Sequence, residues 1–261
     1  MAKILGIVNL TPDSYYAPSR AQERAALLSR VESLVEEGAD AIDLGAASSR
    51  PGSVPVGAAE EWARLEPALE AVREAFPAVP LSIDTYRAAV VEKAVRLIGK
   101  VMVNDISAGA FDPGMLEAVS GLGLPYIAMH LEGTLQTMHT PGRYPGGVTD
   151  AVVRYFEAFA RRASDAGLRD WILDPGFGFS KSLEDNWILL RELDRLLPLQ
   201  RPVLVGISRK SMIYKLFGIT PEQALPATQA AHLIALQKGA AWLRVHDVAE
   251  ARRTVEIYSR M

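Results

Sequence analysis

Short apolar runs recur along the whole chain, and each one ends in a polar residue that is followed by a helix-like pattern. The runs are rich in Val, Ile and Leu and are too short to form helices of their own. A strand that is covered on both faces has this pattern, so we expect eight buried strands. The runs are Ile4–Val8, Ala41–Leu44, Leu81–Ile83, Val101–Val103, Pro125–Met129, Trp171–Leu173, Val203–Ile207 and Trp242–Val245.

Amphipathic stretches with start and stop signals separate the predicted strands. The first stretch has apolar residues at helical spacing and ends at Gly38, which is typical of a C-terminal cap. Ser182 and Thr220 each begin a capping-box pattern, and Gly167 and Gly239 stand where two helices should end. The expected helices cover Ala21–Glu37, 58–76, 88–98, 112–121, 151–166, Trp187–Leu197, 222–238 and 248–259.

Strands that alternate with helices over 261 residues have the order and size of an α/β protein of the (β/α)8 or TIM-barrel type. A doubly wound open sheet is the alternative. Its dinucleotide-binding form is disfavoured, because no Gly-x-Gly-x-x-Gly turn follows the first predicted strand. No linker or repeat interrupts the pattern, so we expect a single domain over residues 1–261.

Composition excludes several classes of protein and site. The chain has no cysteine, which rules out disulfides, thiolate metal sites and a cysteine nucleophile. A net charge of −3 disfavours a nucleic-acid partner. No segment approaches the run of about 20 apolar residues that a membrane helix requires. We therefore expect a soluble cytoplasmic protein that contacts neither nucleic acid nor membrane.

Polar residues collect at the carboxyl ends of the predicted strands, which is where TIM barrels carry their active sites. Any one of them could instead cap a helix or brace a loop. Together they predict a pocket for a polar heterocycle that bears an anionic group. The residues are Asn9, Asp43, Asp84, Asn104, Asp105, His130, Asp174, Ser208, Arg209, Lys210, Arg244 and His246.

Three loops have side chains suited to phosphate or diphosphate, namely 48–52, 208–211 and 244–246. Arginine presents a planar fork that fits phosphate oxygens, and the last two loops follow strands after which barrels often bind phosphate. Salt bridges between these cations and nearby carboxylates are the alternative interpretation.

Metal and nucleophile chemistry are constrained by the spacing of the histidines and serines. The four histidines lack the short spacing of a zinc site, and we expect His139 and His232 to be surface or helix residues. Mg²⁺ remains compatible with the sequence, because a diphosphate can supply most of its ligands. No serine has the spacing of a Ser–His–acid triad.

The loops at these strand ends resemble, in order, the motifs of the dihydropteroate synthase family. The resemblance covers nearly the whole chain, and the ordered set is far more specific than any single motif. The stretches are Asn9–Ser14 (NLTPDS), Asp43–Gly52 (DLGAASSRPG), Ser82–Thr85 (SIDT), Val103–Gly109 (VNDISAG), Met129-His130, Asp174–Phe179 (DPGFGF), Ser208–Ser211 (SRKS) and Arg244–Val248 (RVHDV).

The resemblance implies a homodimeric TIM barrel that acts in folate biosynthesis. It would condense 6-hydroxymethyl-7,8-dihydropterin diphosphate with 4-aminobenzoate, with Mg²⁺, through a cation-like carbon as the diphosphate leaves. By position, the implied ligands are Asp84, Asn104, Asp174, Lys210 and Arg244 for the pterin; Ser49, Arg50, Arg244 and His246 for the diphosphate; Ser49, Pro51, Phe179, Lys210 and Ser211 for the aminobenzoate; and Asn9 for the metal.

Two loops depart from the family pattern. Where the family usually has Asp-Gly-Gly in the first loop, this chain has Ala17-Pro18-Ser19, and Ala46-Ala47 replaces Gly-Glu in the second loop. Ser49 replaces a threonine but keeps the hydroxyl. The lost acidic residues affect the expected closing of the loops over the aminobenzoate and the fit of sulfonamide analogues.

Two other functions stay open at this point. One is a methyltransferase that uses methyltetrahydrofolate, whose barrel also binds a pterin. The other is a pterin-binding homologue that has lost turnover through its loop changes.

Overall fold

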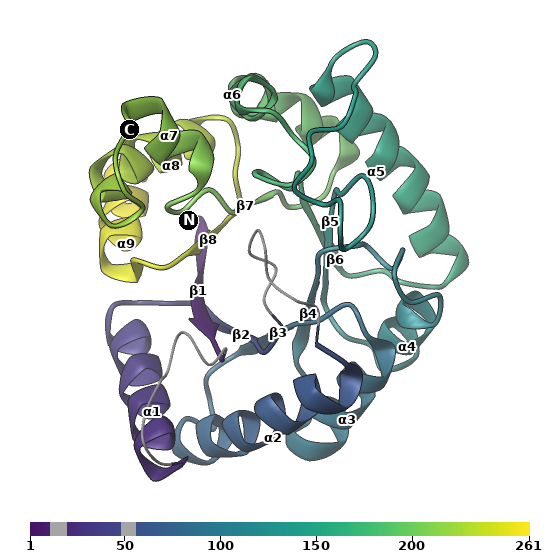
Figure 1. Ribbon diagram of the computed structural model, residues 1–261, viewed down its shortest axis with the longest axis vertical. Coiled ribbons are helices and arrows are strands. Elements are labelled where there is room, and N and C mark those ends of the chain that lie inside the picture. The colour runs from purple at the N-terminus through teal and green to yellow at the C-terminus, as the bar shows by residue number, and fades with distance from the viewer. Residues whose placement is uncertain (11–19, 48–55) are drawn as a thin grey trace.

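The chain folds into a ring of eight parallel strands surrounded by helices, as Figure 1 shows. The computed structural model describes residues 1–10, 20–47 and 56–261. The expected (β/α)8 barrel is confirmed. The strands are β1 (Lys3–Asn9), β2 (Ala41–Gly45), β3 (Leu81–Asp84), β4 (Met102–Asp105), β5 (Tyr126–Met129), β6 (Trp171–Asp174), β7 (Leu204–Val205) and β8 (Trp242–Val245).

The strand order excludes the doubly wound sheet. Neighbours run β6-β5-β4-β3-β2-β1-β8-β7, so the first and last strands of the chain lie side by side. An isolated bridge between Leu173 and Val203 joins β6 to β7, and the Leu173 N–H donates to the Pro202 carbonyl at 3.0 Å. β7 is shorter than the expected Val203–Ile207, because the Ile207 carbonyl accepts from the Lys210 N–H in a turn.

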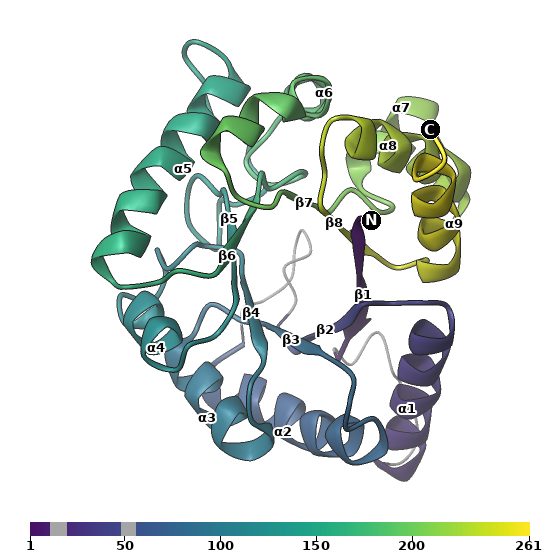
Figure 2. The ribbon, with the colours of Figure 1, turned by 180° about the vertical axis from the view of Figure 1, so that it is seen from behind.

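The helices cover the outside of the strand ring, as the view from behind shows (Figure 2). In the described part of the chain, no helix is long and apolar enough to cross a membrane. The helices are α1 (Arg20–Glu36), α2 (Ala58–Ala75), α3 (Ala88–Ile98), α4 (Met115–Gly121), α5 (Val148–Asp165), α6 (Leu183–Arg191), α7 (Ser211–Phe217), α8 (Leu225–Gln237) and α9 (Val248–Tyr258), with 3₁₀ turns η1 (Leu193–Leu199) and η2 (Glu222–Ala224).

The expected helix ends agree with the structure at most positions. Gly38 ends α1 with φ +94°, and its N–H donates to the Val35 carbonyl. Ser182 caps α6 through a complete capping box with Asp185. The Thr220 pattern begins the short turn η2 instead of α8, which starts five residues later. Capping signals therefore located these boundaries to within about one turn.

Helix α7 was not predicted. It has seven residues and buries Met212 and Ile213, which is too few apolar positions to show a helical period. Gly218 ends it in the left-handed conformation, with φ +61°. This helix extends the loop that carries the Ser-Arg-Lys-Ser motif, so it positions one wall of the site described below.

Candidate active site

The inward-facing strand positions divide the barrel interior into two layers. Towards the amino-terminal ends these positions are apolar, and Leu5, Ile127 and Trp242 belong to one buried cluster there. Two residues further along, the same face carries polar side chains on β2, β3, β4, β6 and β8, because strand side chains alternate with a period of two, whereas Ile7 of β1 and Met129 of β5 are apolar. The polar layer includes Asp43, Asn104, Asp174 and Arg244.

Arg244 joins carboxylates from two other strands across the barrel. Its Nε donates to Asp43 Oδ2 at 2.7 Å, and its Nη2 donates to Asp84 Oδ2 at 2.8 Å. Asn104 Nδ2 donates to the same Asp43 oxygen at 2.9 Å. The other oxygen, Asp43 Oδ1, is buried and accepts no hydrogen bond from the described residues. A buried acceptor without a donor is costly, so the two bonds that Asp43 Oδ2 accepts have to hold this carboxylate in place.

The charges of this network are perturbed by burial. Burial raises the pKa of Asp84 from its usual 3.8 to about 7, although the neighbouring guanidinium of Arg244 opposes the shift. Burial also works against the charge of Arg244, but the carboxylates of Asp43 and Asp84 raise its pKa above the ordinary value. Arg244 therefore stays cationic, while Asp84 titrates near neutral pH.

Asp174 and Lys210 form a second polar pair at the floor of the site. Asp174 Oδ1 accepts from the Gly176 N–H at 2.8 Å, and burial raises the pKa of this carboxyl. Lys210 Nζ donates to the Phe177 carbonyl and lies 4.7 Å from the centre of the Phe179 ring. Burial lowers the pKa of Lys210 to about 8, while the charge of Asp174 opposes that shift. The pair places one cation and one buried carboxyl beside an aromatic surface.

A cavity of about 630 Å³ opens above these residues at the carboxyl ends of the strands. Its size suits one ligand of drug-like dimensions or two smaller ones. Its wall contains nine of the residues that the sequence assigned to the site. These are Asn9, Asp84, Phe179, Ser208, Arg209, Lys210, Ser211, Arg244 and His246.

Asn104 and Asp174 are buried and do not form part of the cavity wall. Asn104 belongs to the Arg244 network, and the charge of Asp174 acts on Lys210, which is in the wall. Ser49, Arg50 and Pro51 lie outside the described residues, and so does the departure at Ala17. At the other departure, Ala47 lines the cavity, whereas Ala46 is buried and its carbonyl accepts from Arg64.

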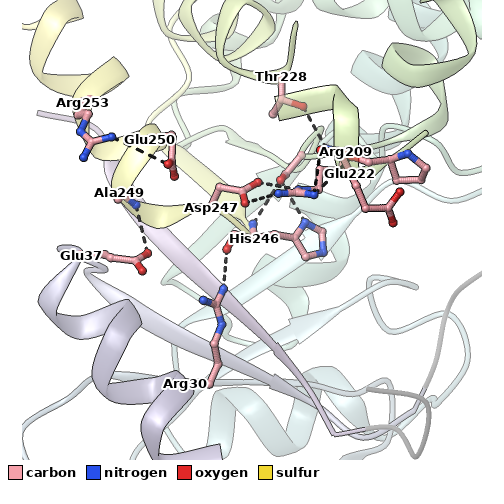
Figure 3. Close-up of polar contacts among 12 residues, drawn as sticks. Arg30, Glu37, Arg209, Glu222, Thr228, His246, Asp247, Ala249, Glu250 and Arg253 are labelled. Carbon is pink, nitrogen blue, oxygen red and sulfur yellow. Dashed lines mark hydrogen bonds and ion pairs between the residues drawn. The ribbon is translucent and has the colours of Figure 1, made fainter. Parts of the chain in front are cut away.

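At the rim, the loops after β7 and β8 are bonded to one another (Figure 3). Arg209 donates to both carboxylate oxygens of Asp247, at 2.8 and 2.6 Å. His246 Nδ1 lies 3.1 Å from Ser208 Oγ, and Arg30 of α1 donates to the His246 carbonyl at 2.6 Å. For Arg209 the salt-bridge interpretation is therefore correct, and its guanidinium braces the loops. His246 remains in the cavity wall.

Two residues of the predicted strand-end set face away from the pocket. Asp105 and His130 each directly follow an inward-facing residue, Asn104 or Met129, so their side chains point outward, towards the helices. Asp105 accepts from the Tyr126 hydroxyl at 2.6 Å and from the backbone N–H groups of Ser107 and Gly109. These contacts show that Asp105 braces a loop.

His130 is bonded to a buried lysine that the sequence interpretation missed. Lys181 Nζ lies 3.0 Å from His130 Nδ1 and donates to the carbonyls of Gly176 at 2.9 Å and Phe179 at 3.1 Å. Burial lowers the pKa of Lys181 to about 7 and that of His130 well below its usual value. The lysine therefore holds the loop that carries Phe179. Its position two residues after the Asp174–Phe179 stretch was the available signal.

The two remaining histidines were expected to be surface or helix residues. His232 is a helix residue, since it lies in α8, where it is fully buried. His139 lies in the loop between β5 and α5 and lines the cavity, with its ring stacked 5.3 Å from that of Phe179. The sequence interpretation missed His139, because it lies nine residues beyond the end of the nearest predicted strand motif and outside any strand.

The described residues contain no group of three or more His, Asp or Glu side chains arranged to hold a metal ion. Asn9, at the end of β1, offers one amide oxygen in the cavity wall. This oxygen is a hard ligand that suits Mg²⁺. Among the described residues, this single oxygen would suit a Mg²⁺ ion that takes most of its ligands from a substrate diphosphate.

Comparison with known proteins agrees with this geometry. The model of the "Pterin binding enzyme" family matches residues 5–246. The chain is 37% identical over 258 residues to the dihydropteroate synthase of Escherichia coli K12, covering 97% of this chain and 90% of that protein.

Solved structures of similar proteins have the same fold. That of Thermus thermophilus dihydropteroate synthase in complex with 4-aminobenzoate is 42% identical, with a TM-score of 0.88 and coverage of 100% of this chain and 94% of that one. The Yersinia pestis dihydropteroate synthase, solved with a sulfonamide drug, is 36% identical, with a TM-score of 0.89 and coverage of 99% and 93%. The chain belongs to the dihydropteroate synthase family of pterin-binding enzymes.

Proposed function

We propose that the cavity condenses 6-hydroxymethyl-7,8-dihydropterin diphosphate with 4-aminobenzoate to give 7,8-dihydropteroate and diphosphate. The observation that carries this proposal is the polar layer of the barrel. Its carboxylates, amide and guanidinium form one network, and Asp84 and Arg244 of that network lie in the wall of the cavity. The enzyme is a transferase of the dihydropteroate synthase type.

The amino-pyrimidinone edge of a pterin presents N–H donors next to carbonyl and ring-nitrogen acceptors. We assign its recognition to Asp84, Asn104 and Asp174, whose side chains offer matching acceptors and donors. An unmatched buried polar group costs about 1–3 kcal/mol, so this match would also reject heterocycles with a different pattern.

Arg244 and Lys210 complete the pterin site in this proposal. Arg244 is held at Nε and Nη2 by two carboxylates, so the plane of its guanidinium is fixed. A fixed, flat cation is suited to lie against the face of a heterocycle. Lys210 lies between Asp174 and the Phe179 ring, and its ammonium can donate to the pterin carbonyl while it borders the arylamine.

The diphosphate belongs at the rim, where His246 and Ser208 lie in the cavity wall. We assign Ser49 and Arg50 to the same end, from their place in the family motif. Mg²⁺ bound with the diphosphate, and held by Asn9, would neutralise charge on the leaving group. His246 is kept in place through its carbonyl by Arg30 and through its ring by Ser208.

The reaction exchanges one bond at the exocyclic methylene carbon of the pterin. The C–O bond breaks with its electron pair going to the diphosphate, and the arylamine nitrogen forms a bond to the same carbon. One proton then leaves the nitrogen for water or the departing diphosphate. Arylamines are weak bases that attack as the neutral amine, so the site needs no strong general base. Its main contribution is orientation and stabilisation of the leaving charge.

We assign the 4-aminobenzoate site to Phe179, Lys210 and Ser211, together with Pro51 and Ser49. The first three lie in the cavity wall beside the pterin floor, which places the amine near the reacting carbon. Sulfonamides resemble 4-aminobenzoate in shape, so we propose that they bind this site too. A homodimer and a cytoplasmic location are further proposals that rest on the family.

The test is product formation by the purified protein. With dihydropterin diphosphate, 4-aminobenzoate and Mg²⁺, chromatography should show one dihydropteroate for each diphosphate released. A methyltransferase would instead bind methyltetrahydrofolate and show no preference for the diphosphate. A homologue without turnover would bind the diphosphate substrate and form no product, and this result would contradict the proposal.

A further inference from the structure

The loop after β6 places a buried lysine behind the wall of the candidate site. Lys181 is 6% exposed and does not belong to the cavity wall. Its ammonium donates to the Gly176 carbonyl at 2.9 Å and to the Phe179 carbonyl at 3.1 Å, and it lies 3.0 Å from His130 Nδ1. An ammonium has three N–H donors and no acceptor, so all three donors are used and His130 accepts through Nδ1.

The imidazole of His130 is suited to accept this bond. Burial and the neighbouring ammonium lower the pKa of His130 well below its usual value, so the ring is neutral. The ring lies edge-on to that of Tyr155, with centroids 4.8 Å apart and planes inclined by 82°. The backbone N–H of His130 donates to the Asp174 carbonyl at 2.9 Å. The end of β5 therefore presents a fixed acceptor to the lysine.

The backbone of the loop after β6 needs support around Phe179. Gly178 and Ser180, on either side of it, have φ of +79° and +49°, and such a conformation is unfavourable for a residue with a side chain. Both N–H groups donate at 2.7 Å, one to a side chain of α6 and the other to a carbonyl of the β5–α5 loop. These bonds hold the N–H groups beside Phe179, whereas Lys181 holds the Phe179 carbonyl itself.

The ring of Phe179 is the part of the site that this support places. It lies in the cavity wall, with its centre 4.7 Å from Lys210 Nζ, and the proposed function assigns it to the arylamine. The pterin is assigned to the floor, where the Gly176 N–H holds the Asp174 carboxylate at 2.8 Å. Loss of the Lys181 ammonium removes a bond from the Phe179 carbonyl and leaves the bond to Asp174 in place. Arylamine and pterin binding should therefore respond differently.

We propose that Lys181 is a positioning residue of the arylamine site, which holds the Phe179 ring in place through the Phe179 carbonyl and is itself oriented by His130. The inference rests on the proposed function, and it adds to the arylamine site a residue that lies behind the cavity wall. A misplacement of about 1 Å in a group that positions a substrate is costly for the reaction. The effect of Lys181 on the arylamine should therefore require the Phe179 ring.

The test is a double-mutant cycle between Lys181→Met and Phe179→Ala. In Lys181→Met we expect KM for 4-aminobenzoate to rise about tenfold, while the affinity for a diphosphate-free dihydropterin stays within about threefold of wild type. In the double variant, KM should exceed that of Phe179→Ala by no more than about twofold, because the two residues act as one unit. Additive effects on KM, or an equal loss of affinity for both ligands, would indicate a merely structural lysine and overturn the inference.

Two variants at His130 test the same role while the lysine stays in place. His130→Phe keeps a ring beside Tyr155 and removes the acceptor, so KM for 4-aminobenzoate should rise about threefold or more. His130→Asn places Oδ1 where Nδ1 lies and should keep KM closer to that of wild type. Equal values in these two variants would overturn the inference, also in the case that Lys181→Met does not fold. Lys238→Met is the control, because Lys238 pairs with the exposed Asp194, and it should behave as wild type.

Calorimetric binding of 4-aminobenzoate, in the presence of diphosphate and a diphosphate-free dihydropterin, separates this inference from the proposed function. If wild type forms no product but binds 4-aminobenzoate, and the cycle is non-additive, then Lys181 keeps its role and the proposed function fails. If wild type forms product and the cycle is additive, only the inference on Lys181 fails. Absence of both product and 4-aminobenzoate binding in wild type would contradict the two together.

Discussion

The cross-barrel contacts of Arg244 make a strong prediction about stability and its dependence on pH. Arg244→Met keeps much of the side-chain volume and removes both charge-assisted hydrogen bonds, to Asp43 and to Asp84. Such bonds contribute about 1.5–3 kcal/mol each, and removing one partner of a buried ion pair typically costs about 3–5 kcal/mol. The Arg244 side chain is 21% exposed, which places the expected loss near the lower end, at about 3 kcal/mol at pH 8.5.

The sign of the pH dependence follows from Asp84. Its folded-state pKa is about 7, so at pH 5.5 it is neutral in wild type and its bond to Arg244 joins a cation to an uncharged carboxyl group. Above pH 7 the carboxylate forms and needs the guanidinium. The destabilisation by Arg244→Met should therefore grow as pH rises from 5.5 to 8.5, by about 1–2 kcal/mol.

Urea unfolding at pH 5.5 and 8.5 measures both quantities. Arg195→Met is the control, because Arg195 pairs with Asp150 and Glu192 but its side chain is 50% exposed. Exposed pairs contribute about 0–1 kcal/mol, so this variant should change little at either pH. A loss below about 1 kcal/mol for Arg244→Met at pH 8.5, or an equal loss at both pH values, would refute the reasoning.

Three further predictions concern binding and the loop that carries Phe179. Asp174→Ala should weaken the binding of a diphosphate-free dihydropterin at least about 30-fold in calorimetry. Asp194→Ala removes a carboxylate from an exposed ion pair and should leave this affinity unchanged. Equal affinities of the two variants would show that Asp174 does not belong to the site. In wild type the affinity for the diphosphate-free dihydropterin should fall as pH drops from 8 to 6, because the Asp84 carboxyl loses an acceptor when it is protonated. In Asp84→Asn this affinity should depend less on pH. Lys181→Met should lower the free energy of unfolding by about 1–3 kcal/mol in urea, since the Phe179 carbonyl loses its donor and the Gly176 carbonyl keeps only the Phe179 N–H; a loss under about 0.5 kcal/mol would show that other groups hold this loop.

Much of the fold could be predicted from the sequence, because each buried strand is a short, nearly continuous apolar run. The strand at Val203–Ile207 was overestimated, since the apolar run continues into a turn at Ile207. Helix α7 could not be predicted, because seven residues with two buried apolar positions carry no clear period. Both differences occur beside the Ser-Arg-Lys-Ser loop, where functional residues replace regular patterning.

The part of the candidate site that lies at the strand ends could be predicted, because side chains alternate between the inner and outer faces of each strand. Inward positions such as Asp84 and Arg244 lie in the cavity wall, and Asp105 and His130 could have been excluded by counting alternate residues along β4 and β5. His139 could not be found this way. Its place depends on hydrogen bonds between two loops, which no periodic pattern records.

The central claim is that this cavity couples departure of the diphosphate to attack by the arylamine. The direct measurement is the rate of diphosphate release from dihydropterin diphosphate with Mg²⁺, with and without 4-aminobenzoate, for wild type and Asp174→Ala. The account predicts release in wild type that depends on the amine and yields dihydropteroate, and loss of that release in the variant. Release at the same rate without the amine, or tight binding of the substrate without any release, would contradict it.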